Sequence, residues 1–302
     1  MGYLQAITIL SGCNLLAVLG MAVLTGYTGL FSIGHAGFMA LGAYMGGILA
    51  KELGWHLVPC LIGAGAFAGF ISLGIGYPAF RSRLRGDYFA IATLGFAEAL
   101  RLLLNNIHSI GKINLGGAYG YMDLPLLKNM TFLPDWAVVV IVCLVALYLS
   151  HMFVTSQYGM NCIAVRQDES AAEMMGVDLM STKLLALFVS AFLAAMGGAL
   201  LAFYFGYINP SFFGIQRSSD LLASVVFGGI QSLIGPFITA ILIVAVPQLL
   251  LTFALYRFIV YGLLFVVVMV FRPQGLFGYV QMNFDWITRL WRRKPPVAME
   301  QP

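Results

Sequence analysis

The sequence predicts an all-α integral membrane protein, folded as a multi-helix bundle of about eight to ten segments, some of them broken or re-entrant. The chain has 302 residues, of which 61% are hydrophobic and 9% are charged, and its mean hydropathy is +0.91. Soluble domains are roughly 45–50% apolar and about 25% charged. A single soluble core could not bury this much apolar surface, so a soluble enzyme, a disordered protein and a nucleic-acid-binding protein are disfavoured.

The apolar runs along the chain define the expected segments. They are 4–25, 29–50, 57–77, 87–107, 136–154, 183–206, 219–233, 236–255 and 257–271. Each run is continuously apolar rather than alternating in steps of two, which favours helices over a β-barrel. The run 219–233 is short and contains Asp220. We therefore expect it to be a broken or re-entrant helix rather than a plain crossing.

Basic residues predict the orientation of the bundle. With the N-terminus outside, segments 78–86, 155–182 and the chain after 271 share one side, which holds Arg81, Arg83, Arg85, Arg166, Lys183, Arg272, Arg289, Arg292, Arg293 and Lys294. The other side holds fewer: Lys51, Lys112, Lys128, Arg217 and Arg257. The positive-inside rule assigns the first group to the cytoplasm. Residues 1–278 are then the membrane domain, and 279–302 form an amphipathic tail on the inner membrane surface.

The residue pattern of a polar loop, 155–182, predicts one or two short helices on the cytoplasmic face. Its apolar and charged positions interleave: Ile163, Val165, Ala171, Met174 and Met175 with Arg166, Asp168, Glu169 and Glu173. Gly176 is the expected helix C-cap. A Met-Met pair flanked by carboxylates suits docking into a groove of another protein. The alternative is a simply solvated connection.

Glycine-rich stretches occur in both halves of the chain. Residues 25–47 contain Gly26, Gly29, Gly34, Gly37, Gly42, Gly46 and Gly47, and residues 218–240 contain Gly228, Gly229, Gly235 and Pro236. Glycine lets helices approach closely in lipid and lets a helix break where it lines a cavity. Paired interrupted segments hint at an internal repeat around a central pathway, although the identity between the halves is low.

Three polar side chains fall inside predicted spans. His35 is either a helix-packing residue or a contact of the pathway. Glu98 and Arg101 are three residues apart, so they can pair on one helix face. Mutual neutralisation is the simpler interpretation, because a charge at mid-membrane costs about 2.5–3.5 kcal/mol. Lining a pathway is the alternative.

No motif for catalysis, nucleotide binding or metal binding is present in the sequence. Gly111–Lys112 lacks the flanking residues of a P-loop, and the four cysteines have no ligand spacing. We therefore expect a non-catalytic chain without a cofactor or metal.

Five segments carry a family resemblance. They are GYTGLFSIGHAGFMALGAY (26–44), RLRGDYFAIATLGFAE (83–98), AVRQDESAAEMMGVD (164–178), KLLALFVSAFLAAMGGALLAFYFGYINP (183–210) and FRPQGLFG (271–278). In this order they closely resemble the LivM-type permeases, the membrane subunits of branched-chain (hydrophobic) amino-acid ABC importers. The resemblance implies the fold of such permeases and a location in the bacterial inner membrane.

The resemblance also implies partners and site residues. Such importers combine two related permeases (LivM and LivH types), two cytoplasmic ATPases and a periplasmic substrate-binding protein. Loop 155–182 would be the coupling loop that docks into an ATPase, through Arg166, Asp168, Glu169, Ala172, Glu173, Met174, Met175 and Gly176. Ser32, Gly34 and His35 would lie near the pathway between the permeases, with Glu98 and Arg101 as further candidates. From their length and their side of the membrane, we predict that the segments 108–135 and 206–218 contact the binding protein.

Two alternatives remain at this stage. The same architecture imports urea, short amides or aromatic acids in similar transporters, and the permease carries little of that specificity. A stand-alone channel or secondary transporter is the second alternative. It would need buried carboxylates for ion coupling, and only Glu98 qualifies.

Overall fold

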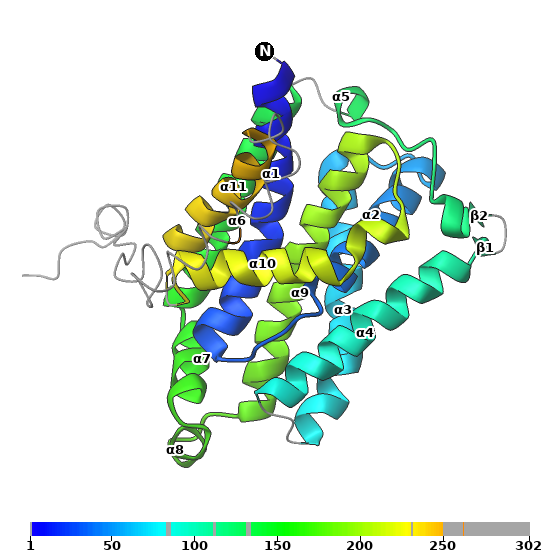
Figure 1. Cartoon of the computed structure of the whole chain (residues 1–302). Helices are drawn as coiled ribbons and strands as arrows, with labels where there is room; N and C mark the ends of the chain where they lie inside the picture. Colours follow the sequence, from blue (N-terminus) through cyan, green and yellow to red (C-terminus); the bar gives the residue numbers. More distant parts are fainter. Residues whose placement is uncertain are drawn as a thin grey trace, which may run out of the picture.

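The fold is a bundle of long helices, seen in a computed structural model that describes residues 2–82, 86–110, 113–130, 134–230, 232–249 and 262 (Figure 1). The helices are α1 (Gly2–Met21), α2 (His35–Glu52), α3 (Leu57–Arg81), α4 (Asp87–Asn106), α5 (Leu127–Met130), α6 (Asp135–Thr155), α7 (Gln157–Gln167), α8 (Glu169–Met174), α9 (Leu179–Phe205), α10 (Ile215–Gly228) and α11 (Ile234–Leu249). A π-helical segment η1 (Ala22–Tyr27) extends α1, and short 3₁₀ turns form η2 (Gly117–Tyr119) and η3 (Pro210–Phe213). A small antiparallel hairpin pairs β1 (Ser109–Ile110) with β2 (Ile113–Asn114).

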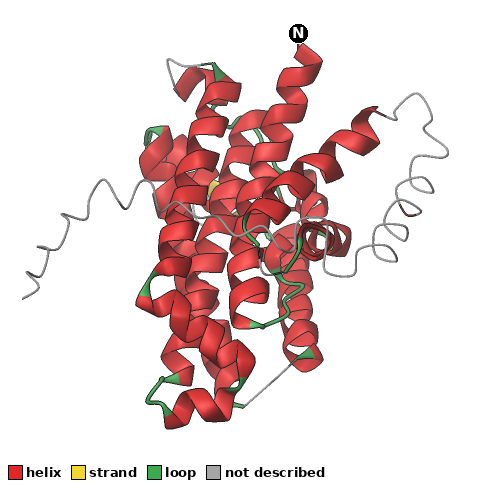
Figure 2. Ribbon diagram, turned by 90° about the vertical axis from the view of Figure 1, so that its left-hand side faces the viewer, coloured by secondary structure: helices red, strands yellow, loops and turns green. Residues whose placement is uncertain are grey.

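Four described helices are long and apolar enough to cross a membrane: Gln5–Tyr27, Leu57–Arg81, Asp135–Thr155 and Leu179–Phe205. Figure 2 shows the long helices side by side, with loops at their ends and also within the bundle. The last turn of α3 and the short helix α8 lie at one end, and the N-terminus lies at the other (Figure 1). The basic residues predict the same arrangement, with 78–86 and 155–182 on one side and the N-terminus on the other.

Helix α9 is the centre of the packing and contacts α1, α2 and α3. Small residues allow these helices to come close. A Cβ on Gly42 would collide with the backbone of Ala195, and a Cβ on Gly198 would collide with the backbone of Met39. This agrees with the expectation that glycine brings helix backbones together in lipid.

The second predicted span is not helical from its beginning. The run 29–50 was expected as one segment, but residues 29–34 are irregular and α2 begins at His35. Gly29 has φ +74, a left-handed conformation that glycine adopts without strain. The side-chain hydroxyl of Thr93 on α4 accepts the backbone N–H of Ile33 at 3.2 Å. A partner distant in sequence thus stabilises the irregular stretch.

The segment expected to be broken is indeed short. Helix α10 has 14 residues and ends at Gly228, and Gly229 follows with φ +107. The helix lies across the long axes of α1 and α9, about midway along them (Figure 1). A Cβ on Gly228 would overlap the backbone at Gly235 and Pro236, so the turn into α11 requires glycine.

Some predicted features fall outside the described residues. They are the basic residues Arg83 and Arg85, the apolar run 257–271 apart from residue 262, the FRPQGLFG motif and the amphipathic tail 279–302.

Candidate functional site

Two short helices form the end of the bundle opposite the N-terminus, as the polar loop 155–182 predicts. The Ser156 side chain caps α7 by accepting the N–H of Gly159 at 3.5 Å. The Asp168 carboxylate caps α8 by accepting the N–H groups of Ser170 and Ala171 at 2.8 and 3.0 Å. Gly176 ends α8 with φ +84, and its N–H donates to the Glu173 carbonyl at 3.0 Å. Both helices are therefore fixed by their own capping residues.

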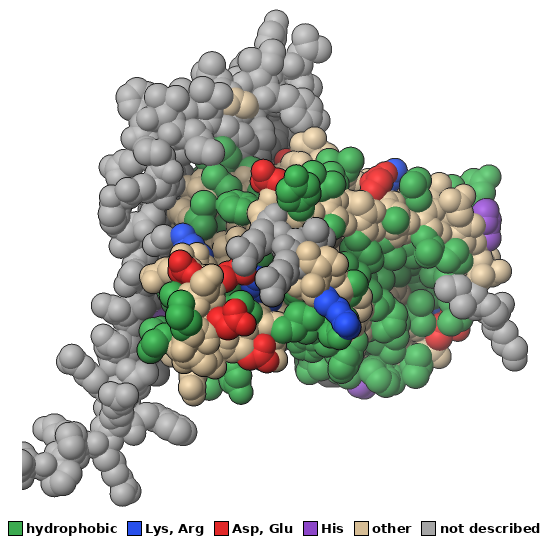
Figure 3. Space-filling model, turned by 90° about the horizontal axis from the view of Figure 1, so that it is seen from below, with side chains coloured by type: hydrophobic (Ala, Val, Ile, Leu, Met, Phe, Trp, Pro, Cys, Tyr) green, Lys and Arg blue, Asp and Glu red, His purple; other side chains and the backbone are tan. Residues whose placement is uncertain are grey.

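The tip of this segment is strongly exposed. Met174 and Met175 expose 83% and 85% of their surface, and Asp168, Glu173 and Gly176 are also exposed. Figure 3 shows acidic side chains gathered on this part of the lower face. We call Asp168, Glu173, Met174, Met175 and Gly176 the α8 tip. It presents apolar side chains within an acidic border.

The other predicted residues of the loop point into the bundle. Arg166 donates from Nη1 to the Gly26 carbonyl at 2.5 Å, and its aliphatic part lies against Gly29. Glu169 forms an ion pair with Lys183 of α9 at 2.8 Å. Ala172 is 4% exposed. Arg166 and Glu169 attach the segment to η1 and α9. The predicted set therefore divides into an exposed tip and residues that are buried or bonded to the bundle.

Ser32, Gly34 and His35 lie together where α2 begins, in the interior of the bundle. Ser32 and His35 are fully buried. The His35 Nε2 is 2.6 Å from the Ser190 hydroxyl of α9, and the N–H of Ala36 donates to the Ser218 hydroxyl of α10 at 3.2 Å. With Thr93 of α4, side chains from three helices contact the start of α2, and the buried His35 Nδ1 has no hydrogen-bond partner in the described part of the chain. In this chain the three residues lie where the start of α2 contacts α4, α9 and α10 inside the bundle.

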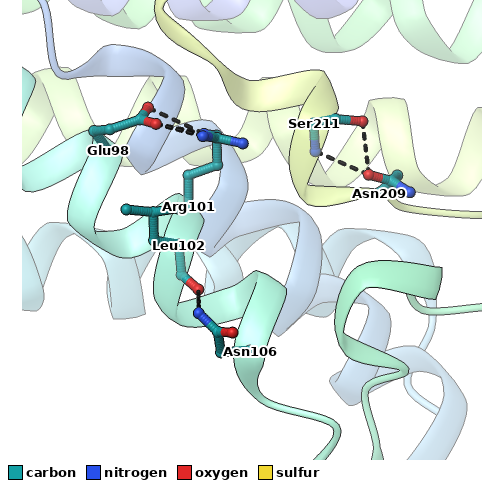
Figure 4. A network of polar contacts seen from close by, with 6 residues as sticks. All are labelled: Glu98, Arg101, Leu102, Asn106, Asn209 and Ser211. Carbon is teal, nitrogen blue, oxygen red and sulfur yellow. Dashed lines mark hydrogen bonds and ion pairs between the residues drawn. The ribbon is translucent and has the colours of Figure 1, made fainter.

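Glu98 and Arg101 pair on α4, as their spacing predicts (Figure 4). The Arg101 Nε lies 2.9 and 3.0 Å from the two carboxylate oxygens, and Nη2 also contacts Oε1. The Arg101 and Glu98 side chains are 28% and 32% exposed, respectively. Helix α4 contacts η3, the turn that Asn209 begins by accepting the N–H of Ser211 at 2.9 Å. The pair is thus neutralised on a partly open face.

The two segments at the opposite end, 108–135 and 206–218, meet in one surface. Tyr121 and Ile208 form an antiparallel bridge, with N···O distances of 2.8 and 3.0 Å. The Tyr207 hydroxyl donates to the Tyr119 carbonyl at 3.1 Å. A hollow of about 610 Å³ lies beside them, lined by Lys51, His108, Ser109, Asn114, Gly116, Tyr119, Gly120, Met122 and Asp123. We call this the outer surface.

Comparison with known proteins identifies the family. Residues 3–271 match the family described as branched-chain amino acid transport system / permease component. The chain belongs to this permease family. The LivM permease of Escherichia coli is 32% identical over 282 residues, and that of Salmonella typhimurium is 33% identical over 285; each match covers 85% of this chain and 66% of the relative. A probable LivH permease of Methanocaldococcus jannaschii is 26% identical over 297 residues, 90% of each chain.

The match covers just under two thirds of the LivM relatives' length. No solved structure matches the chain. The resemblance to LivM-type permeases that the five motifs indicate is confirmed, and the chain is a multi-pass, membrane-spanning permease.

Sequence reasoning missed one polar group of this permease. Arg217 was assigned to an outer connection, but it lies in α10, and its Nε and Nη2 atoms are buried. Asn14 of α1 is 9% exposed, and its Oδ1 has no hydrogen-bond partner in the described part of the chain. The signal available was a lone arginine beside a short apolar run. Its burial depends on how α10 crosses the bundle.

Proposed function

We propose that this permease is a subunit of an ATP-driven importer in the bacterial inner membrane and forms, with a related LivH-type permease, a pathway for branched-chain amino acids. Its LivM and LivH relatives are named as branched-chain amino acid permeases. The observation that carries the ATP-driven part is the α8 tip. Two methionines that are 83% and 85% exposed lie on a short, capped helix at the end of the bundle.

An exposed apolar pair within an acidic border is suited to a groove on a second protein. We infer that two cytoplasmic ATPases bind there and hydrolyse ATP, and that the permease itself catalyses no reaction. Arg166 and the Glu169–Lys183 pair attach the tip to η1 and α9. A displacement of α8 would therefore be transmitted to the central helices of the bundle.

The outer surface is the proposed contact for a periplasmic binding protein. Tyr119 and Met122 are 76% and 51% exposed there. Tyr121 is 1% exposed and bridges to Ile208, so deleting the loop would also disturb the fold. The sharper test is Tyr119→Glu, which we expect to leave the fold intact and to remove stimulation by the binding protein.

The decisive experiment is uptake in reconstituted vesicles. The full chain is assembled with its LivH-type partner, ATPases and binding protein, and uptake of radiolabelled leucine is measured with and without ATP. We expect uptake only with ATP and with all components. Uptake by this chain alone would contradict the proposal and favour a secondary transporter.

Charge reversal tests the docking surface. Glu173→Lys changes an exposed carboxylate of the α8 tip, and Glu52→Lys makes the same change at the exposed end of α2 near the outer surface. We expect both variants to insert in the membrane. Only Glu173→Lys should lose co-purification with the ATPases, and equal co-purification of both variants would contradict the docking surface.

A further inference from the structure

A cavity of about 210 Å³ lies between α1, α10 and α11. It is separate from the α8 tip and from the outer surface. Its lining combines polar and aliphatic side chains: Leu10, Asn14, Arg217, Asp220, Leu221, Ser224, Ala240, Ile243 and Val244. Drug-sized ligands occupy cavities of about 300–1,000 Å³. This cavity is smaller, so it suits a small metabolite.

Arg217 brings a cation with unpaired hydrogen-bond donors to the cavity. Its Nε and Nη2 atoms are buried and have no hydrogen-bond partner among the described residues. Buried donors without a hydrogen-bond partner are costly, and polar groups at membrane depth are partnered or functional. A guanidinium presents parallel N–H donors that match the two oxygens of a carboxylate. No described side chain provides a carboxylate that accepts from both of these Arg217 N–H groups.

Two acceptors lie in the same cavity. The Oδ1 of Asn14 is buried and without a hydrogen-bond partner in the described part of the chain. Asp220 lies three residues after Arg217 on α10, so both side chains occupy one helix face. Its Oδ1 accepts from the Gln216 side chain at 3.2 Å. A carboxylate and an amide oxygen together suit an ammonium group.

The charge balance decides between classes of ligand. Arg217 and Asp220 together carry no net charge, so a simple anion would leave Asp220 uncompensated and a simple cation would leave Arg217 uncompensated. A zwitterion satisfies both. The aliphatic walls, from Leu10, Leu221, Ala240, Ile243 and Val244, would accept an apolar side chain of the ligand.

We propose that this cavity binds a zwitterionic amino acid with an aliphatic side chain. Its carboxylate pairs with the Arg217 guanidinium, its ammonium with Asn14 and Asp220, and its side chain lies against the aliphatic walls. The inference rests on the proposed function, because it places the transported substrate class at a definite site within the permease.

The test compares three related ligands on the full-length chain in lipid nanodiscs, by saturation-transfer NMR. The ligands are L-leucine, L-leucinamide, which lacks the carboxylate, and 4-methylpentanoate, which lacks the ammonium. We expect L-leucine to bind most tightly. Arg217→Gln should weaken L-leucine about tenfold or more and change L-leucinamide little, so the preference for a carboxylate is lost. Asp220→Asn should instead remove the preference over 4-methylpentanoate.

The matched control is Arg81→Gln, which removes an exposed arginine outside the cavity. It should keep both preferences. A structural role of Arg217 would weaken the three ligands equally, and this would overturn the proposal. So would absent L-leucine binding to the wild-type chain, or a loss of association with the second permease with ligand preferences unchanged. If Arg217→Gln fails to fold, Asp220→Asn and Asn14→Ala decide by the ammonium preference.

ATP-driven uptake separates this inference from the proposed function. If the wild-type importer transports leucine, and the cavity variants transport leucine at the wild-type rate, the cavity assignment alone is wrong. If the complete importer shows no ATP-driven uptake, the proposed function is wrong.

Discussion

The helix crossings in the bundle interior and the segment at its lower end use glycine in opposite ways. At the crossings, Gly42 and Gly198 leave no room for a Cβ because backbone from another helix occupies that space. At the α8 tip, Gly176 has open space around it, but its φ of +84 disfavours a side chain. The interior thus needs glycine for close approach, and the α8 tip needs it for backbone conformation. Substitutions should therefore damage folding in one region and coupling in the other.

The largest effect is expected at a helix crossing. In Gly198→Ala the added methyl would overlap the Met39 backbone, so α2 and α9 would have to separate. Such overpacking costs about 3 kcal/mol of unfolding free energy. The matched control is Gly74→Ala on α3, where nothing lies within 4 Å. Unfolding in mixed detergent micelles should show a large loss for the first variant only, and equal stability of the two would contradict the close approach.

The next largest effect shows whether the α8 tip needs glycine for its backbone conformation or for lack of space. Gly176→Val cannot easily adopt φ +84, whereas Gly176→Asn can, because asparagine tolerates the left-handed region. We expect Gly176→Val to insert normally and to lose most ATP-driven uptake, and Gly176→Asn to keep most of it.

Gly54 provides the control for that substitution. It has φ +66 and open space, and it lies in the turn between α2 and α3, away from the α8 tip. Gly54→Val introduces comparable strain and should leave uptake nearly unchanged. Loss of uptake in both valine variants would mean that strain alone, rather than the position of α8, is responsible.

A smaller effect concerns the attachment of α8 to the bundle. The side chains of Lys183 and Glu169 are 9% and 21% exposed, and the Lys183 ammonium also lies 6.0 Å from the centre of the Phe80 ring. Glu169→Gln leaves a buried cation without its anionic partner and should cost about 1–2 kcal/mol. Lys183→Met keeps the apolar stem and leaves a carboxylate that water can reach, so it should cost less.

The double variant Glu169→Gln/Lys183→Met completes a thermodynamic cycle for this pair. It should recover part of the loss of Glu169→Gln, because the stranded cation is gone. Chemical denaturation of the three variants in one detergent measures this, and strictly additive losses would show that the pair contributes no coupling.

The sequence predicted the helical elements well where apolar composition alone determines them. The runs 57–77, 87–107 and 136–154 correspond to α3, α4 and α6 within a few residues. The start of α2 at His35 could not be predicted in this way. It depends on hydroxyl groups of Thr93, Ser190 and Ser218, which lie on three other helices.

The identity of the docking residues stays a prediction, and the structure adds the direction in which each side chain points. Motif similarity selected Arg166 and Glu169 as exposed docking residues, but a motif does not say which way a side chain points. The structure directs them to Gly26 and Lys183. Arg217 was missed for a related reason, since the charge count placed it in a connection before the run 219–233. Its burial follows from the course of α10 across the bundle (Figure 1).

The smallest effect is a pH dependence at the start of α9, where the polar segment joins the interior. The Asp178 carboxylate accepts the Ser181 hydroxyl at 2.5 Å and the N–H groups of Ser181 and Met180 at 3.3 and 3.0 Å. These hydrogen bonds, chiefly those from Ser181, lower the pKa of Asp178 in the folded protein. The cap therefore stabilises the fold fully above the ordinary aspartate pKa of about 3.9, and this contribution is lost as the pH falls through the lowered folded-state pKa. Asp178→Asn keeps a capping oxygen but does not titrate, so the melting temperatures of the two proteins should differ slightly near neutral pH and converge on acidification. A difference that stays constant with pH would show that the charge of the cap contributes nothing.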